Sequence, residues 1–175
     1  MNPAWIVRTA RLTLQPVGWR DLPELKTLKS DPRVFAMMLG GVRGPVQAAE
    51  ELAADLAFWA ARRVGMWSAR HRDTGAFLGI VGLMERPDGL GTALRFGFWP
   101  DVRGRGLARE AAGAALRFAH EQAELERVIA VAREDNFASR IVLGAIGMAE
   151  CAAFNRAGNR MLIYASTVRP EPCSA

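Results

Sequence analysis

Three short runs rich in apolar residues, near the middle of the chain, restrict its fold more than any other feature. Met66–His71, Phe77–Glu85 and Thr92–Phe98 have the length and the aliphatic and aromatic content of β-strands. Turn-forming residues separate them, namely Asp73-Thr74-Gly75 and Pro87-Asp88-Gly89. Because a parallel crossover needs a dozen or more residues, connections this short predict an antiparallel meander.

One strand and three helical segments are predicted before the meander. In residues 11–17 apolar and polar side chains alternate, which is typical of a half-buried strand. Asp21 is expected to begin a helix by accepting hydrogen bonds from its free amides, and Glu24 to complete a capping-box-like pair. A short helical piece is expected over residues 31–41, and an amphipathic helix is expected to begin at Pro45.

Helices and strands alternate after the meander. Helices are predicted over residues 106–122 and 137–145, and strands over residues 127–132, 148–154 and 160–167. The fold class is therefore α+β (mixed α and β), with the strands in one sheet. A length of 175 residues suits a single domain, residues 1–175, with its core over about residues 8–168.

The connection between the third strand of the meander and the next helix predicts an anion site. Residues 103–106 read Arg-Gly-Arg-Gly and lead directly into the helix. A helix N-terminus offers unpaired N–H groups and the positive end of its dipole, and glycines let a phosphate approach the backbone closely. Two arginines add positive charge at the same place. Taken alone, the pattern is equally typical of an ordinary strand-to-helix turn.

Other phosphate-binding motifs and other ligand classes fit less well. The chain has no Lys after Lys29, which argues against a P-loop, and Arg109 occupies the last glycine position of a dinucleotide fingerprint. The histidines are isolated and the cysteines lack ligand spacing, so no metal site is expected. The net charge of +5 is spread along the chain and interleaved with acidic residues, so no nucleic acid is expected as a partner.

The turn resembles that of a known family. Arg103-Gly104-Arg105-Gly106-Leu107-Ala108 is similar to the Gln/Arg-x-x-Gly-x-Gly/Ala pattern of the GNAT N-acetyltransferases. Residues 136–139, Asn-Phe-Ala-Ser, with Gly147 after them, and residues 11–14 and 31–34 resemble the branch of ribosomal-protein-alanine N-terminal acetyltransferases. The resemblance covers about residues 8–165. It implies a central, mostly antiparallel twisted sheet with a splayed parallel strand pair, flanked by helices.

The resemblance also implies an activity and a set of binding residues. A primary amine, either a protein N-terminus or a small-molecule amine, would attack the thioester of acetyl-CoA directly. The residues expected to bind the coenzyme are Phe98 through a backbone amide near it, Arg103, Gly104, Arg105, Gly106, Leu107, Ala108 and Asn136. For Asn136, the residue pattern alone is equally typical of a helix cap.

The catalytic residues are less clearly indicated. Ser139 is expected to lie near the sulfur and to protonate the departing thiolate, although a serine here is also typical of a helix surface. Many relatives have an acidic residue as general base where this chain has Arg95. Glu85 is the replacement base that we favour, with His71 and Glu150 as alternatives.

Arg95 leaves two interpretations of the protein open. The acceptor amine can carry a carboxylate that binds Arg95, or the chain can be a coenzyme-A-binding sensor or scaffold with degenerate catalytic machinery.

The sequence favours a cytoplasmic protein without a membrane partner. The two cysteines do not form a disulfide framework, and neither a signal peptide nor a long apolar segment is found. The family resemblance makes a homodimer possible.

Overall fold

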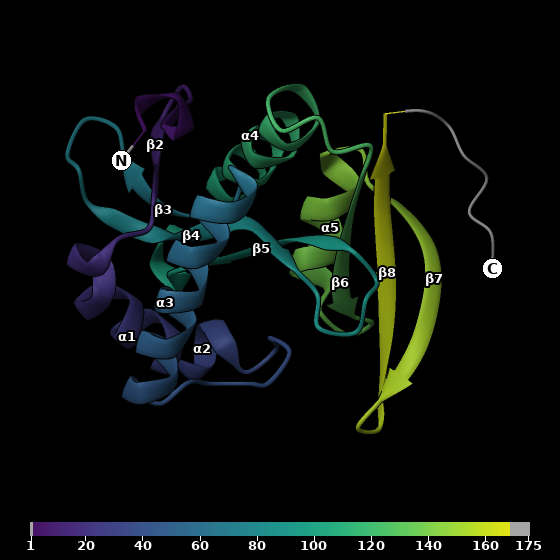
Figure 1. The fold of residues 1–175 in the computed structure, drawn as a ribbon. Coiled ribbons are helices and arrows are strands. Elements are labelled where there is room, and N and C mark those ends of the chain that lie inside the picture. Colours follow the sequence, from purple (N-terminus) through teal and green to yellow (C-terminus); the bar gives the residue numbers. More distant parts are fainter. Residues whose placement is uncertain (1, 169–175) are drawn as a thin grey trace.

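The computed structural model describes residues 2–168, and its centre is an eight-stranded sheet (Figure 1). Residues 169–175, with Cys173, lie outside the described residues. The strands are β1 (Val7–Arg8), β2 (Leu12–Pro16), β3 (Met66–His71), β4 (Phe77–Glu85), β5 (Thr92–Phe98), β6 (Arg127–Arg133), β7 (Ala149–Arg156) and β8 (Asn159–Thr167). Across the sheet their order is β1-β2-β3-β4-β5-β6-β8-β7.

The predicted meander is confirmed. β3, β4 and β5 pair antiparallel with their neighbours, and their bounds agree with the three runs expected from the sequence. The first predicted strand is also confirmed, since Leu12, Leu14 and Pro16 of β2 are buried and the residues between them are partly exposed. β2 therefore has one face in the core, whereas β3 and β4 are buried along most of their length.

One strand pair in the sheet is parallel. β5 and β6 pair at a single position, Ala93 with Ile129, whereas every other neighbouring pair is antiparallel and longer. Beyond that position the two strands are not paired, which confirms the expected splayed parallel pair. β8 lies between β6 and β7, so the chain places its last strand inside the sheet and leaves β7 at the edge.

Helices cover the two faces of the sheet (Figure 1). They are α1 (Leu22–Ser30), α2 (Pro32–Phe35), α3 (Pro45–Arg62), α4 (Leu107–Glu121) and α5 (Phe137–Ala145), with short 3₁₀ turns at Pro3–Trp5, Trp19–Asp21 and Pro100–Val102. Neighbouring residues of β3 point to opposite faces. Met66 packs with residues of α1, α2 and α3, and Trp67 packs with the buried face of α4, which includes Phe118 and several alanines.

Two local expectations are wrong. Asp21 does not cap α1: its carboxylate accepts from the amide of Gly18 and binds Arg70 of β3, which also binds Glu24. The partly buried guanidinium of Arg70 competes more strongly for these carboxylates than the helix amides do. The helical piece after residue 31 ends at Phe35 instead of residue 41, and turns follow it.

No helix among residues 2–168 is long and apolar enough to cross a membrane.

Candidate active site

The candidate site begins at the gap between β5 and β6. Directly after β5, the amide of Trp99 donates a hydrogen bond to the carbonyl oxygen of Leu78 in β4 (3.0 Å). Successive amides along a strand point to opposite sides. The amide of Phe98 therefore points away from β4 and toward the gap, while its side chain is buried in the core.

The turn after β5 presents a row of free backbone amides. None of the amides from Gly104 to Arg109 donates a hydrogen bond to another residue in the described part of the chain. Gly104 and Gly106 have φ angles of 74° and 72°, which favour glycine. A Cβ atom at Gly104 would meet no atom within 4 Å. The amides thus face open space at the positive end of the α4 dipole, as an anion site requires.

A hydrogen-bond network fixes the position of this turn. The carboxylate of Glu110, in the first turn of α4, accepts from Thr9 Oγ1 (2.6 Å) and from the amide of Arg11 (2.8 Å). Arg11 Nη1 donates to the carbonyl oxygen of Arg105 (2.8 Å). Burial works against ionisation of Glu110, but the hydrogen bonds from Thr9 and Arg11 outweigh it and lower the pKa of the carboxyl group.

The two arginines of the turn have different roles. Arg103 Nη2 donates to the carbonyl oxygen of Arg33 (2.6 Å) and so joins the turn to α2. Arg105 is exposed and its side chain makes no hydrogen bond to another described residue. Of the two guanidinium groups, that of Arg105 is therefore free to bind an anion, whereas that of Arg103 helps to position the turn.

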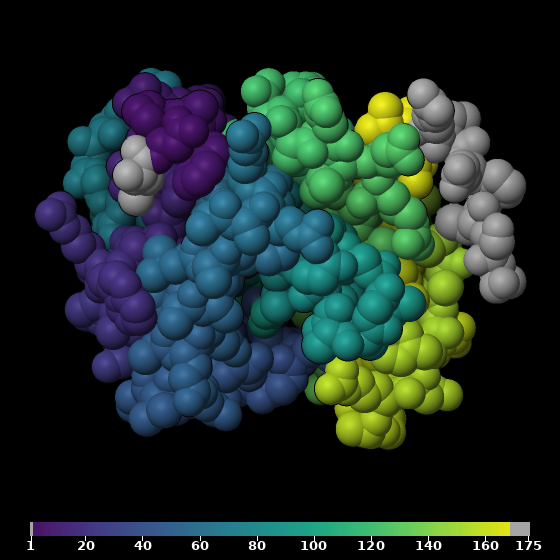
Figure 2. Space-filling model, in the orientation of Figure 1, coloured from purple at the N-terminus to yellow at the C-terminus, as the bar shows by residue number. Residues whose placement is uncertain are grey.

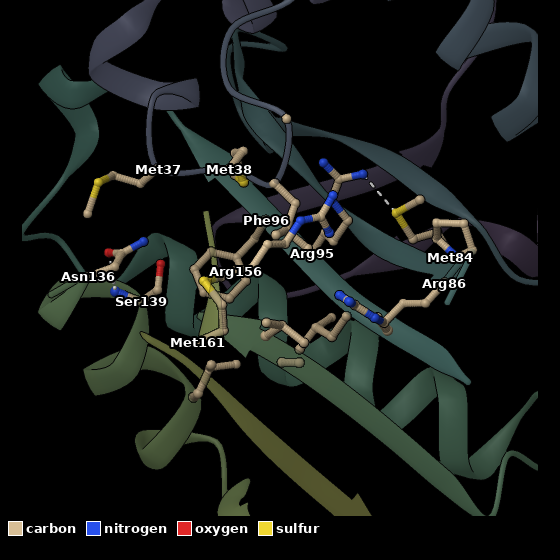
Figure 3. A pocket seen from close by; sticks show the side chains of 18 of the residues that line it. Met37, Met38, Met84, Arg86, Arg95, Phe96, Asn136, Ser139, Arg156 and Met161 are labelled. Carbon is tan, nitrogen blue, oxygen red and sulfur yellow. Dashed lines mark hydrogen bonds between the residues drawn. The ribbon is translucent and has the colours of Figure 1, made fainter. Parts of the chain in front are cut away.

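A cavity of about 280 Å³ lies at the same gap. A hollow is visible between α3 and the connection from β4 to β5 (Figure 2). Residues from both strands, from α5 and from the segment after α2 line the cavity (Figure 3): Met37, Met38, Leu39, Gly40, Arg43, Glu51, Met84, Arg86, Pro87, Ala93, Leu94, Arg95, Phe96, Ala130, Val131, Asn136, Ser139, Leu143, Arg156 and Met161. A volume near 300 Å³ is at the lower end of the range for small-molecule sites.

Asn136 and Ser139 lie on one side of this cavity (Figure 3). Asn136 Oδ1 accepts from the amide of Ser139 (3.2 Å), so Asn136 caps α5. Its Nδ2 group and the hydroxyl of Ser139 make no hydrogen bond within the described residues. The two interpretations of Asn136 are thus compatible, because the oxygen caps the helix while the amino group stays available for a ligand.

Arginines also line the cavity. Arg95 comes from β5, Arg86 directly follows β4, and Arg156 is the last residue of β7 (Figure 3). Arg95 was expected from the sequence to be important, whereas Arg86 and Arg156 were not identified. No local pattern marks them, because they meet only when β7 and β4 are placed in the same sheet.

A smaller cavity of about 90 Å³ adjoins the first and shares Glu51, Met84 and Arg95 with it. Asp55, one turn after Glu51 on α3, lines this second cavity. Burial raises the pKa of Asp55 to about 6, against the opposing charges of Lys29 and Arg95. Neither acidic residue was identified from the sequence, which showed only an amphipathic helix there.

Glu51 behaves differently from Asp55. It accepts hydrogen bonds from Lys29 Nζ (2.7 Å) and Arg43 Nε (2.5 Å). Burial works against its ionisation, but these partners outweigh it and lower the pKa of Glu51. Glu51 is therefore a structural counter-ion, and Asp55 is the carboxylate that can take up a proton near neutral pH.

The bases expected from the sequence lie elsewhere. Glu85 is exposed at the end of β4 and accepts a hydrogen bond from Thr92 Oγ1 (3.5 Å). His71 is the last residue of β3, and its Nδ1 accepts from the amide of Asp73 (3.3 Å) in the turn that follows. Glu150 binds the hydroxyl of Tyr164 (3.3 Å). None of the three lines the larger cavity or the smaller one beside it.

Among residues 2–168, no group of three or more potential metal ligands is found.

Comparisons with known proteins agree with this geometry. The Acetyltransferase (GNAT) domain model matches residues 11–149. The structure is similar to an acetyltransferase from Agrobacterium tumefaciens (TM-score 0.81, 26% identity, 92% of this chain and 93% of the other). It is also similar to a GNAT-family acetyltransferase from Bacillus anthracis (0.79, 19%, 93% and 98%). A third similar structure is a ribosomal L7/L12 α-N-protein acetyltransferase in complex with coenzyme A (0.78, 14%, 93% and 98%). No curated protein matches the sequence.

Proposed function

Because the chain belongs to the family of GNAT acetyltransferases, we propose that it transfers the acetyl group of acetyl-CoA to a primary amine by direct attack. One observation carries the proposal. A row of amides without acceptors, from Gly104 to Arg109, lies at the N-terminus of α4 and directly after the strand that borders the gap. This arrangement suits the pyrophosphate of acetyl-CoA.

Residues on both sides of the gap suit the pyrophosphate and the pantetheine arm of acetyl-CoA. Residues 104–108 would hold the pyrophosphate with their amides, and Arg105 would add a charge-assisted hydrogen bond. Asn136 Nδ2 would donate to the pantetheine arm. Open glycine positions with positive φ leave room for the phosphates at the turn. The similar L7/L12 acetyltransferase that binds coenzyme A supports the same assignment.

The thioester supplies an activated acyl group, so the protein itself needs no covalent step. The amine nitrogen forms a bond to the acetyl carbon, the carbon–sulfur bond breaks, and coenzyme A leaves as thiolate. The amide of Phe98 points into the gap, where it can donate to the acetyl oxygen as negative charge develops. A preorganised donor of this kind contributes on the order of 3 kcal/mol to lowering the barrier.

Two protons must move during the reaction. The hydroxyl of Ser139 lines the cavity and can protonate the departing thiolate. The proton that the amine loses needs a basic acceptor, and Asp55 suits this role through water in the adjoining cavity, because its pKa lies near 6. Glu85 stays a prediction for the same role, from a more exposed position.

The proposal also covers the biological setting. The acceptor is a protein N-terminus or a small-molecule amine, the enzyme acts in the cytoplasm, and it can form a homodimer. Similarity to the L7/L12 acetyltransferase supports the protein N-terminus as one acceptor. Light scattering coupled to size-exclusion chromatography tests the dimer, and acetylation of N-terminal peptides tests the first kind of acceptor.

Calorimetric titration with acetyl-CoA tests the central claim. The double variant Gly104→Glu, Gly106→Glu should lose the micromolar binding expected of the wild type, since carboxylates would occupy the phosphate site. Gly75→Glu is the matched control: Gly75 has a similar φ of 71° and open space around it, but lies in the turn between β3 and β4. No binding to wild type would refute the proposal. Binding without turnover of any amine would favour the sensor or scaffold instead.

A further inference from the structure

Four arginines line the cavity: Arg43, Arg86, Arg95 and Arg156. Figure 3 shows Arg86 and Arg95 on the side away from Asn136, with Arg156 between them and Asn136. The carboxylate of Glu51 is the only acidic group that lines the cavity within the described residues, and Lys29 and Arg43 already bind it. This side of the cavity is therefore strongly positive. The positive charge of these arginines exceeds the negative charge of the carboxylates that bind them.

Two of the arginines have partners that explain them. Arg43 donates to Glu51 and to the carbonyl oxygens of Gly41 and Leu39, so its guanidinium closes the loop before α3. Arg86 forms two hydrogen bonds with the carboxylate of Asp88, in the turn between β4 and β5. A guanidinium that is already bound in this way has little capacity left for a ligand.

Arg95 and Arg156 have no such partner. Arg95 Nη1 contacts the sulfur of Met84 (2.8 Å), a weak acceptor, and Arg95 forms no salt bridge within the described chain. Burial lowers the pKa of its guanidinium, while Glu51 and Asp55 oppose the shift without contacting it. Arg156 is exposed at the cavity rim and makes no side-chain hydrogen bond or ion pair to any of residues 2–168.

The partly buried guanidinium of Arg95 has lost some of its water without gaining a carboxylate, and an anion in the cavity would replace that water. Arg156 adds a second unpaired guanidinium at the exposed rim of the same cavity. The planar donor set of arginine matches a carboxylate, which can accept two hydrogen bonds at once. Arg95 and Arg156 line the same cavity as Asn136 and Ser139, where the proposed function places the acetyl donor. A ligand bound to the arginines is thus held beside the reacting acetyl group.

We propose that the acceptor is an amine that also carries a carboxylate, which Arg95 and Arg156 bind while the amine faces the acetyl group. This inference rests on the proposed function. The carboxylate can belong to a free amino acid or to an acidic residue near the N-terminus of a peptide. Polycationic amines are disfavoured, because the arginines repel them.

Initial rates of coenzyme A release test the inference with substrate pairs that differ in one carboxylate. Glutamate against glutamine and alanine against alaninamide probe free amino acids, Ser-Glu against Ser-Gln peptides probe N-termini, and spermidine probes polycations. Each is measured with wild type, Arg95→Gln and Arg156→Gln. Arg127→Gln is the control, since Arg127 is exposed at the start of β6 and outside the cavity.

The carboxylate-bearing member of at least one pair should be preferred by wild type, and Arg95→Gln should reduce its kcat/KM about 10- to 100-fold. Arg127→Gln should leave this value unchanged, and all variants should bind acetyl-CoA as wild type does. Equal or faster turnover of uncharged or polycationic amines would overturn the inference but keep the proposed function. A preference that survives both arginine variants would overturn the assignment to these residues. No turnover of any amine would overturn both.

Discussion

Arg11 and Glu110 form an ion pair that joins the start of β2 to the first turn of α4: Arg11 Nε and Nη2 each lie 2.7 Å from Glu110 Oε2. The same guanidinium binds the carbonyl oxygen of Arg105. The turn proposed to bind phosphate is therefore held by residues about a hundred positions earlier in the sequence. Without this pair, the free amides of the turn would lose their fixed orientation.

Glu110→Gln should lower the free energy of unfolding by about 1–2 kcal/mol at pH 7 and weaken acetyl-CoA binding. The pKa of Glu110 is lowered in the folded protein, so its stabilisation is present above its ordinary pKa of about 4.5 and is lost as the pH falls through the folded value. Urea unfolding at several pH values checks this. The difference between wild type and variant should shrink toward pH 3, and a difference independent of pH would contradict the ion-pair explanation.

Asn136 caps α5 and is proposed to bind acetyl-CoA, and two substitutions distinguish these roles. Asn136→Asp keeps an oxygen that caps α5 but removes the amino group, so stability should change by less than about 0.5 kcal/mol while acetyl-CoA binds about 10-fold more weakly. Asn136→Ala removes both groups and should also destabilise the protein by about 1 kcal/mol. Thermal unfolding and calorimetry measure the two effects. Unchanged binding by the aspartate variant would leave Asn136 as a cap only.

The stability of the protein should depend on the ionisation of Asp55. Its pKa in the folded protein, about 6, is above the ordinary 3.8, so its contribution is fully present below about pH 4 and is lost as the pH rises through 6. Wild type should therefore lose on the order of 2 kcal/mol relative to Asp55→Asn between pH 4 and pH 7. Unfolding curves of both proteins over this range provide the measurement, and parallel pH profiles would count against the raised pKa.

Asp55 and Glu85 are rival acceptors of the amine proton. Asp55→Asn is expected to reduce kcat/KM on the order of 100-fold and to remove the limb of the pH–rate profile near pH 6, whereas Glu85→Gln should change the rate less than about 3-fold. The reason is position, since Glu85 is exposed at the end of β4 and Asp55 adjoins the cavity. The opposite result would assign the role to Glu85.

Ser139→Ala should lower kcat about 10-fold or more with little change in the affinity for acetyl-CoA, because its hydroxyl would act only when the thiolate departs. Steady-state kinetics and a separate binding titration distinguish these quantities. A rate equal to that of wild type would make Ser139 a lining residue of the cavity without a role in proton transfer.

Much of the fold follows from local patterns. The three strands of the meander, α4 and α5 are found within a residue or two of their expected ends, because side-chain alternation, apolar stripes and turn residues act over a few positions. The free amides of the turn before α4, proposed to bind phosphate, are local in the same sense. A strand end, two glycines and a helix start suffice to produce them.

The expected cap at Asp21 failed because Arg70, far away in sequence, binds that carboxylate in the folded chain. The cluster of arginines in the cavity has the same origin. Arg86, Arg95 and Arg156 come together only because β8 enters the sheet beside β6 and brings β7 with it. The sequence by itself determined the fold class, the family resemblance and the glycine turn at the start of α4. Tertiary structure decided which charged side chains share a cavity, because burial and charge pairing depend on contacts between distant segments, which no local pattern records.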